Sequence, residues 1–316
     1  MPRERNSKAR GCARPHEICG RSRTDHGRGR GLAPRVRADR SWATLRLRMI
    51  ASARMYSWSS SSAAAWERLL GWVAKTAEVD LTVLDQSDPT PLDDLWKRED
   101  MGCVFMCGYP WALRQDRPAL LASPVPSPPR YGNRPVYVTD FVVRADGPYR
   151  TLDDTFGGVI AYSGEHSHSG YNAPRHHLLA HVSRERPSLY RAVIGPYGRQ
   201  RPLIDLVAKG EADVAAIDGY ALDLLRRHDP AAAAKVRVVE TTAPAPSPPL
   251  VASPALPAAA RERLVAALTT AHRSADAAPL LADVLLACFD RVTPADFEVF
   301  LERDRAARAA GYPKLA

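Results

Sequence analysis

Residues 159–172, with the sequence VIAYSGEHSHSGYN, decide the fold. Val159–Tyr162 is a short apolar run typical of a buried strand, and we predict a helix over about 169–182. Between them stands a turn rich in serine and glycine. A strand that ends in such a turn and continues into a helix is the building unit of an α/β protein. We therefore predict an α/β fold.

The same alternation extends on both sides of this stretch. Further strands are predicted at 49–55, 81–84, 104–107, 119–122, 136–143, 192–194, 214–217, 236–239 and 250–252. Further helices are predicted at about 63–77, 91–98, 203–208, 221–227, 258–271, 277–287 and 294–309. Strands that alternate with helices indicate parallel sheets with helices on both faces, and ligands bind such sheets at the carboxyl ends of the strands.

The formal charge of +9 is concentrated at one end of the chain. Residues 1–48 carry 14 Lys and Arg against four Asp and Glu, a net charge of +10, and the remaining residues have a net charge of −1. The leading segment has almost no apolar periodicity, so we expect it to be disordered or a spurious extension ahead of Met49. A basic arm for nucleic acid is the alternative for this segment alone. The near-neutral body excludes a body-wide nucleic-acid surface.

The serine-rich turn is the best candidate for a binding site. The free N–H groups of a first helical turn attract anions, and the hydroxyls of Ser167 and Ser169 add donors. Gly170 allows the backbone to approach a ligand closely. This pattern suits a phosphate, phosphonate or sulfate group held without a metal. The alternative is a helix N-cap with no ligand, because serine is common at that position.

Other chemistry is not favoured by the sequence. His166, His168, His176, His177 and His181 invite a metal reading, but no HExxH motif or matching carboxylate accompanies them. Motifs of serine hydrolases, P-loop proteins and dinucleotide-binding proteins are absent from the sequence. Cys107 follows an apolar run without a paired base, which favours a buried structural thiol. We expect no metal, no cofactor and no enzymatic activity. Asp218 follows the apolar run 214–217 at the end of a predicted strand. Two roles are open for its carboxylate, which are contact with a ligand and capping of the next helix.

At these residues the sequence resembles a known family, the phosphate/phosphite/phosphonate substrate-binding proteins of ABC transporters. Residues 50–56, opening Ile50-Ala51-Ser52 and ending Met55-Tyr56, resemble the first strand and first ligand loop of the family. Cys107-Gly108-Tyr109-Pro110 resembles a turn of one branch. Ser167–Asn172 resembles the oxyanion-binding helix start, and Gly210–Asp218 resembles the segment ahead of a ligand residue in the second lobe. The resemblance runs from about Met49 to Ala316.

The resemblance implies a type 2 periplasmic-binding-protein fold, in which two α/β lobes enclose a ligand cleft. The first lobe would comprise 49–143 and 243–316, and the second 146–238. Hinge crossings would lie near Arg144–Asp146 and Glu240–Thr242. The ligand residues carried over position by position are Tyr56, Tyr109, Ser167, His168, Ser169, Gly170 and Asp218. His168 stands where threonine is common, and a protonated imidazole there predicts tighter anion binding below about pH 6.5.

The resemblance also implies a function. The chain would bind a small phosphorus oxyanion and deliver it, as a monomer, to an ABC transporter permease, with no nucleic-acid partner. Family members work in the periplasm, yet neither Met1 nor Met49 opens an apolar secretory segment. The alternative is a cytoplasmic protein on the same clamp, either a ligand sensor or an enzyme of the thiamine-precursor type.

Overall fold

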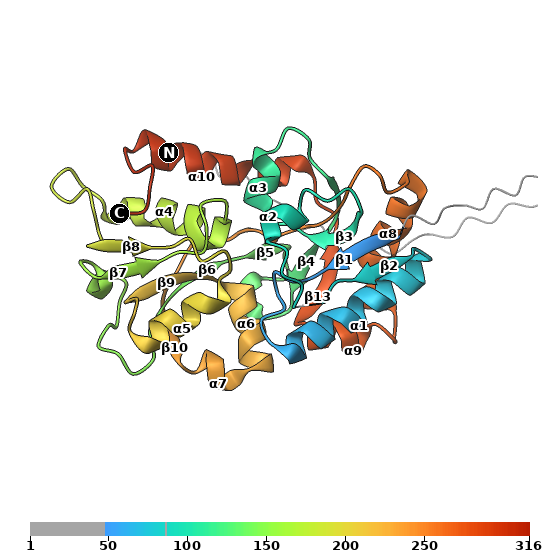
Figure 1. The fold of residues 1–316 in the computed structure, drawn as a ribbon, viewed down its shortest axis with the longest axis horizontal. Coiled ribbons are helices and arrows are strands. Elements are labelled where there is room, and N and C mark those ends of the chain that lie inside the picture. The colour runs from blue at the N-terminus through green and yellow to red at the C-terminus, as the bar shows by residue number, and fades with distance from the viewer. Residues whose placement is uncertain (1–47, 86) are drawn as a thin grey trace, which may run out of the picture. The chain divides into compact units, whose positions relative to one another are not determined.

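The computed structural model describes residues 48–85 and 87–316. Residues 1–47, which carry nearly all of the predicted basic extension, therefore lie outside the described residues. The described chain forms two large β-sheets with helices packed on them (Figure 1). We call each sheet, with the helices that pack on it, a lobe. No helix among the described residues is long and apolar enough to cross a membrane.

The first sheet has six strands in the order β13-β4-β12-β3-β1-β2. Its strands are β1 (Met49–Ser52), β2 (Leu81–Val83), β3 (Met101–Phe105), β4 (Ala119–Pro126), β12 (Leu250–Ala252) and β13 (Leu286–Asp290). The helices along this part of the chain are α1 (Ser60–Ala77), α2 (Leu92–Leu95), α3 (Gly108–Leu113), η1 (Pro129–Tyr131), α8 (Ala258–Thr270), η5 (Ala271–Arg273), α9 (Ala278–Asp283), η6 (Pro294–Phe297) and α10 (Glu298–Ala309).

The second sheet has five strands in the order β10-β6-β9-β7-β8. Its strands are β6 (Thr139–Arg144), β7 (Val159–Ala161), β8 (Ala192–Ile194), β9 (Val214–Asp218) and β10 (Val236–Thr241). The helices here are η2 (Asp153–Thr155), η3 (His168–Asn172), α4 (Ala173–His177), η4 (Leu178–His181), α5 (Arg201–Lys209), α6 (Gly219–His228) and α7 (Pro230–Ala233). The α/β class predicted from the sequence is thus confirmed.

Both sheets are mixed, whereas parallel sheets were expected. In the first sheet β12 runs antiparallel to β3 and β4, and in the second β6 runs antiparallel to β9. The reason lies in the connection. Strands β6 and β12 each enter their sheet directly from the other lobe, without the crossover helix that makes neighbouring strands parallel.

The hinge lies at a different place from the one expected. The run 136–143 was predicted as one strand of the first lobe, but it divides into β5 (Val136–Tyr137) and β6, and β6 pairs with β9 and β10 of the second sheet. β5 instead pairs with β11 (Ala245–Pro246). The backbones of Thr139 and Thr242 are joined beside this pair, with Thr242 N–H donating to the Thr139 carbonyl at 2.9 Å. The chain therefore crosses between the lobes at Val138 and at 242–244, not at 144–146.

The C-terminal segment makes a third connection between the lobes. α10 packs on α3 of the first lobe and on η3 and α4 of the second, and Figure 1 shows it lying along both. Beyond α10, Tyr312 and Leu315 are buried in the core of the second lobe with Phe141 and Val143. Residues 243–316 therefore do not all belong to the first lobe, because the last five residues complete the second.

Two further predictions on local structure were wrong. The turn expected at Gly108-Tyr109-Pro110 is the start of α3, where the missing N–H of proline costs nothing because first-turn N–H groups have no intrahelical partner. The helix expected at 277–287 ends at Asp283 and gives way to β13. Leu285 adopts a φ of 54°, which a helix cannot contain, and so reverses the chain before the strand.

Candidate functional site

A cavity of about 770 Å³ lies between the lobes and is the candidate site. The first lobe supplies the loop after β1, the segment 89–96 and Cys107, and the second supplies the loops after β7, β8 and β9. The residues lining it are Arg54, Met55, Ser57, Trp58, Pro89, Pro91, Leu92, Asp93, Trp96, Cys107, Tyr137, Ser163–Ser167, Ser169, Pro196–Pro202, Asp218 and Pro248. The strand ends of the second sheet therefore open into this cavity, as α/β architecture predicts.

The serine-rich turn is built around Gly170. The Ser167 side chain caps the turn by accepting the Gly170 N–H at 3.0 Å. A Cβ at position 170 would stand 2.0 Å from Ser163 Oγ and 3.0 Å from Ser167 Oγ, so only glycine leaves room for both hydroxyls. The predicted close approach at Gly170 is thus made to the protein's own serines, which are gathered at the cavity wall.

Gln200 ties this turn to the start of α6. Its side-chain Nε2 donates to Ser169 Oγ at 2.7 Å, and its Oε1 accepts the Asp218 N–H at 2.6 Å. The Gln200 amide therefore connects the loop after β7 to the loop after β9 and fixes their relative positions. Gln200 itself comes from a third loop, immediately before α5.

Three buried hydroxyls at or directly behind this end of the cavity lack a well-formed hydrogen bond among the described residues. They belong to Ser163, Tyr137 and Tyr56. Tyr137 lies beside Ser169 and lines the cavity, whereas Tyr56 is buried in the first-lobe core against Trp66 and Phe105. A buried hydroxyl without a partner costs free energy, so these groups mark a place where an acceptor is missing.

Asp218 is a buried carboxylate at the same end of the cavity. Its Oδ1 caps α6 by accepting the N–H groups of Tyr220 and Ala221, both at 3.0 Å. Burial raises the pKa of this carboxyl to about 7, and the two backbone hydrogen bonds oppose the rise. The sequence left a ligand role and a capping role open for Asp218; the structure shows the cap and places the residue at the cavity wall.

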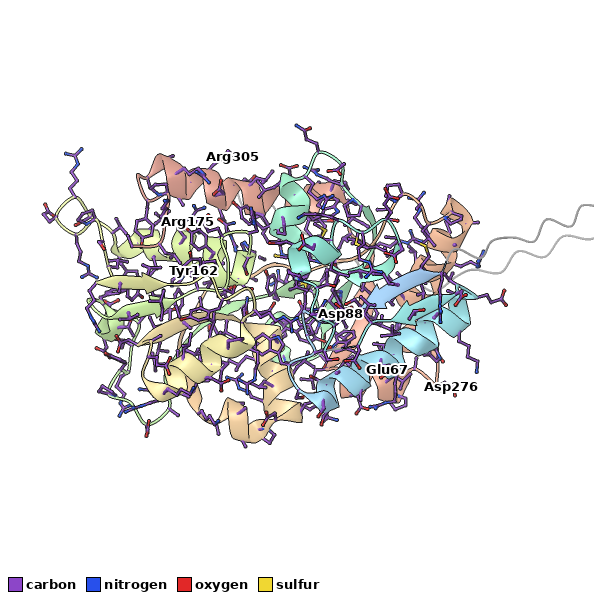
Figure 2. All side chains as sticks on the ribbon, viewed as in Figure 1. Glu67, Asp88, Tyr162, Arg175, Asp276 and Arg305 are labelled. Atoms are coloured by element: carbon purple, nitrogen blue, oxygen red, sulfur yellow. The ribbon has the colours of Figure 1, made fainter. Side chains whose placement is uncertain are left out.

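Arg54 brings a positive charge to the cavity from the first lobe. The residue is only 6% exposed, its Nη2 donates to the Thr90 carbonyl at 2.8 Å, and its Nη1 lies 3.4 Å from an oxygen of Asp88. Arg199, from the loop after β8, reaches the Asp88 carbonyl from the other lobe at 3.5 Å. Figure 2 labels Asp88 near the middle of the view.

His168 does not face the cavity, contrary to the role expected for it. Its ring packs edge-on against Phe300 of α10 with centroids 4.3 Å apart. Its Nδ1 lies 3.2 Å from the amide nitrogen of Asn172 and its Nε2 lies 3.3 Å from Arg303. Burial, and then Arg303, hold the pKa of His168 well below its ordinary value. With donors beside both ring nitrogens, a protonated ring has no acceptor, so the position of His168 does not support the expected gain of anion affinity below pH 6.5.

Tyr109 is also directed away from the cavity. It is buried in α3, and its hydroxyl lies near Asp304 of α10 in surroundings that raise its pKa to about 12, mainly by burial. The neighbouring Cys107 does line the cavity, and burial raises the pKa of its thiol to about 11. Its Sγ accepts the His168 N–H at 3.4 Å, so it joins the first lobe to the serine turn as a neutral thiol.

The five histidines considered as metal ligands do not form one cluster in the described part of the chain, although the ring centroids of His177 and His181 are 6.5 Å apart. His181 pairs with Asp153 at 3.1 Å, His177 lies 4.0 Å from Glu240, and His166 lies 3.9 Å from Asp93. No three His, Cys, Asp or Glu side chains within 48–85 and 87–316 gather as metal ligands would.

The sequence therefore predicted part of this site and missed another part. Ser167, Ser169 and Asp218 line the cavity, Gly170 and Tyr56 lie directly behind it, and His168 and Tyr109 face α10. Gln200, Tyr137 and Arg54 were missed. Arg54 could have been predicted from the sequence, because it follows the first strand in the same loop as Tyr56. Gln200 carried no signal, since nothing local distinguishes it from a solvent-exposed loop residue.

A clamp of two α/β lobes around a cavity lined by loops at strand ends defines the type 2 periplasmic-binding-protein fold. The chain belongs to the family of periplasmic substrate-binding proteins of phosphonate ABC transporters, whose model matches residues 56–297. This match confirms the family resemblance carried by the motifs.

Solved structures at low sequence identity share this fold. A binding protein component of an ABC phosphonate transporter from Pseudomonas aeruginosa has a TM-score of 0.69 at 15% identity, with 84% of this chain and 88% of that chain covered. PhnD1 from Prochlorococcus marinus, in complex with methylphosphonate, has a TM-score of 0.64 at 11% identity, covering 82% and 97%. A Xanthomonas citri protein bound to ATP has a TM-score of 0.54 at 20% identity, covering 83% and 98%. None of the curated protein sequences compared with the chain matches it.

Proposed function

We propose that this chain binds a small phosphorus oxyanion, namely a phosphonate, phosphite or phosphate, in the cavity between its lobes. The observation that carries the proposal is the cluster of hydroxyls of Ser163, Tyr137, Ser167 and Ser169 at one end of the cavity, in which the buried Ser163 hydroxyl has no partner within the described chain. An oxyanion offers several acceptor oxygens at once, and hydrogen bonds to a charged acceptor are stronger than those between neutral groups.

The chemistry of the wall supports a binding role and not catalysis. The thiol of Cys107 is neutral at ordinary pH because burial raises its pKa to about 11, so it is a poor nucleophile. The imidazole of His168 is turned away and hydrogen-bonded elsewhere. We therefore propose that the chain releases its ligand unchanged to an ABC transporter permease. In this proposal it acts in the periplasm as a monomer, without a nucleic-acid partner.

The proposal is tested by thermal unfolding and calorimetry of the full chain with methylphosphonate, phosphite, phosphate and sulfate. A ligand that binds only the folded state raises the unfolding midpoint by mass action. At least one phosphorus oxyanion should raise the midpoint and should bind at least tenfold more weakly to Ser169→Ala. The matched control is Ser127→Ala, because Ser127 is exposed on a loop of the first lobe. No shift with any phosphorus oxyanion at millimolar concentration would refute the proposal.

A further inference from the structure

A second polar group lies in the same cavity and is not used by the oxyanion site. It consists of Arg54 from the first lobe, Arg199 from the second, and Asp88, on which both converge. We call Arg54 and Arg199 the arginine pair. The Nε of Arg54 is buried and has no hydrogen-bond partner within the described chain.

The group has more positive than negative charge. Arg54 pairs with the Asp88 carboxylate, whose same oxygen also accepts the Thr90 N–H at 2.9 Å, whereas Arg199 meets only the main-chain carbonyl of Asp88 at 3.5 Å. Burial and the nearby Arg199 lower the pKa of Arg54, while Asp88 raises it. Two positive charges against one negative charge leave these three residues with a net charge of +1, which an anion between the two guanidinium groups would neutralise.

The arginine pair is separate from the hydroxyl end of the cavity. Arg54 and Arg199 are anchored on the segment that holds Asp88 and Thr90, whereas Ser169 and Asp218 are both anchored by Gln200. Much of the remaining wall is apolar, from Met55, Trp58, Leu92 and Trp96. A volume of about 770 Å³ also falls in the range that accommodates a whole organic ligand instead of a lone oxyanion.

We infer that the ligand carries two anionic groups, and that it belongs to the phosphonocarboxylates. One acid group lies at the hydroxyl end, and the second lies between Arg54 and Arg199, where a carboxylate meets the planar guanidinium groups. Because the two arginines come from opposite lobes, the second group also draws the lobes together. This inference rests on the proposed function.

The test is a comparison of matched ligands on the full chain by calorimetry. 3-Phosphonopropionate and propylphosphonate have similar size but differ in the terminal carboxylate, and 2-aminoethylphosphonate supplies a terminal cation. We expect 3-phosphonopropionate to bind at least tenfold more tightly than propylphosphonate at low salt, and 2-aminoethylphosphonate to bind more weakly than either. Equal binding of the first two, or preference for the ammonium, would overturn the inference.

Two variants locate the effect. Arg199→Ala should reduce the preference for the carboxylate to less than threefold, and it should fold normally because Arg199 is exposed. The control Arg191→Ala removes an exposed arginine of the same lobe that does not line the cavity, and it should keep the full preference. If Arg199→Ala weakens both ligands equally, the arginines hold the phosphorus group itself and the inference fails.

Failure of the inference and of the proposed function can be told apart. If phosphate or methylphosphonate binds but 3-phosphonopropionate gains nothing over propylphosphonate, the oxyanion site stands and the second anionic group is refuted. If no phosphorus oxyanion binds at all, the proposed function is refuted together with the inference.

Discussion

Replacing Gln200 by alanine tests whether one side chain holds the binding loops in place. The substitution removes the hydrogen bond to Ser169 Oγ at 2.7 Å and the one from the Asp218 N–H at 2.6 Å. Each bond contributes about 1 kcal/mol net, so the free energy of unfolding should fall by roughly 2 kcal/mol. For a chain of this size that corresponds to a decrease of about 4–8 °C in the unfolding midpoint.

A second variant separates stability from binding. Gln200→Glu keeps an acceptor for the Asp218 N–H, and the Ser169 hydroxyl can donate to it, but it adds a negative charge beside the proposed anion site. We expect this variant to unfold within about 2 °C of the wild type and to bind the oxyanion at least tenfold more weakly, because like charges repel in a site of low dielectric.

The assays are circular dichroism on heating and calorimetric titration with methylphosphonate, both on the full chain. Gln115→Ala is the matched control, because Gln115 is exposed on a loop of the first lobe. If Gln200→Ala unfolds at the wild-type temperature, the two short hydrogen bonds do not hold the loops, and the reasoning from geometry is wrong.

Three further predictions concern the same region. Gly170→Ala should destabilise the chain by about 1–3 kcal/mol, since its Cβ would stand 2.0 Å from Ser163 Oγ, whereas Gly164→Ala, with nothing within 4 Å, should unfold like the wild type. Burial raises the pKa of Asp218 to about 7 in the folded chain, whereas the pKa is about 3.9 in the unfolded chain. Between these two values the folded state binds more protons than the unfolded state. The free energy of unfolding should therefore fall as the pH rises from 4 to 8, by up to roughly 4 kcal/mol. Asp218→Asn, which keeps the cap, should flatten that decline in urea titrations, and an identical slope in both proteins would contradict the assignment. Arg175→Met should cost about 3–5 kcal/mol by urea unfolding because it strands the buried partners of Arg175, while Arg308→Met, which removes an exposed partner of the same Asp304, should cost under about 1 kcal/mol. Equal losses of unfolding free energy in the two variants would contradict the reasoning that burial makes the interactions of Arg175 more costly to remove.

Local patterns in the sequence predicted the elements that local interactions determine. α1 was expected at 63–77 from the spacing of Trp66, Leu69, Leu70 and Val73, and all four are buried on one face of the helix. It begins three residues earlier, at Ser60, because Ser59 and Ser62 form a reciprocal cap. The serine turn was likewise predicted, since Ser167 caps it through Gly170, three residues away.

Partners distant in the sequence explain what was missed. β13 was read as the end of a helix because a short apolar run suits either element, and it becomes a strand only by pairing with β4. His168 was placed in the site by the family resemblance, at a position where threonine is common, but its ring packs against Phe300 and lies beside Arg303 of α10. β6 was assigned to the first lobe because nothing in the run 136–143 marks where the chain passes from one sheet to the other.

Arg175 shows how firmly the C-terminal helix is fixed to the second lobe. Arg175, which is labelled in Figure 2, is buried against α10. It pairs with Asp304 and donates to the side-chain Oδ1 of Asn172 and to the main-chain carbonyl of Pro313. Asn172 in turn belongs to the serine turn and donates to the Phe300 carbonyl at 3.0 Å. The turn that lines the cavity is therefore supported from behind by α10.

The position of the last five residues has a consequence for how the protein is made. All five strands of the second sheet lie within 139–241, yet Tyr312 and Leu315 complete their core, and the Leu189 N–H donates to the carbonyl of Ala316 at 2.8 Å. Synthesis proceeds from the N-terminus, so the core of this lobe keeps apolar surface uncovered until residues 312–316 have been translated. A chain shortened by a premature stop near residue 310 would have every strand of both sheets and still lack a finished second lobe.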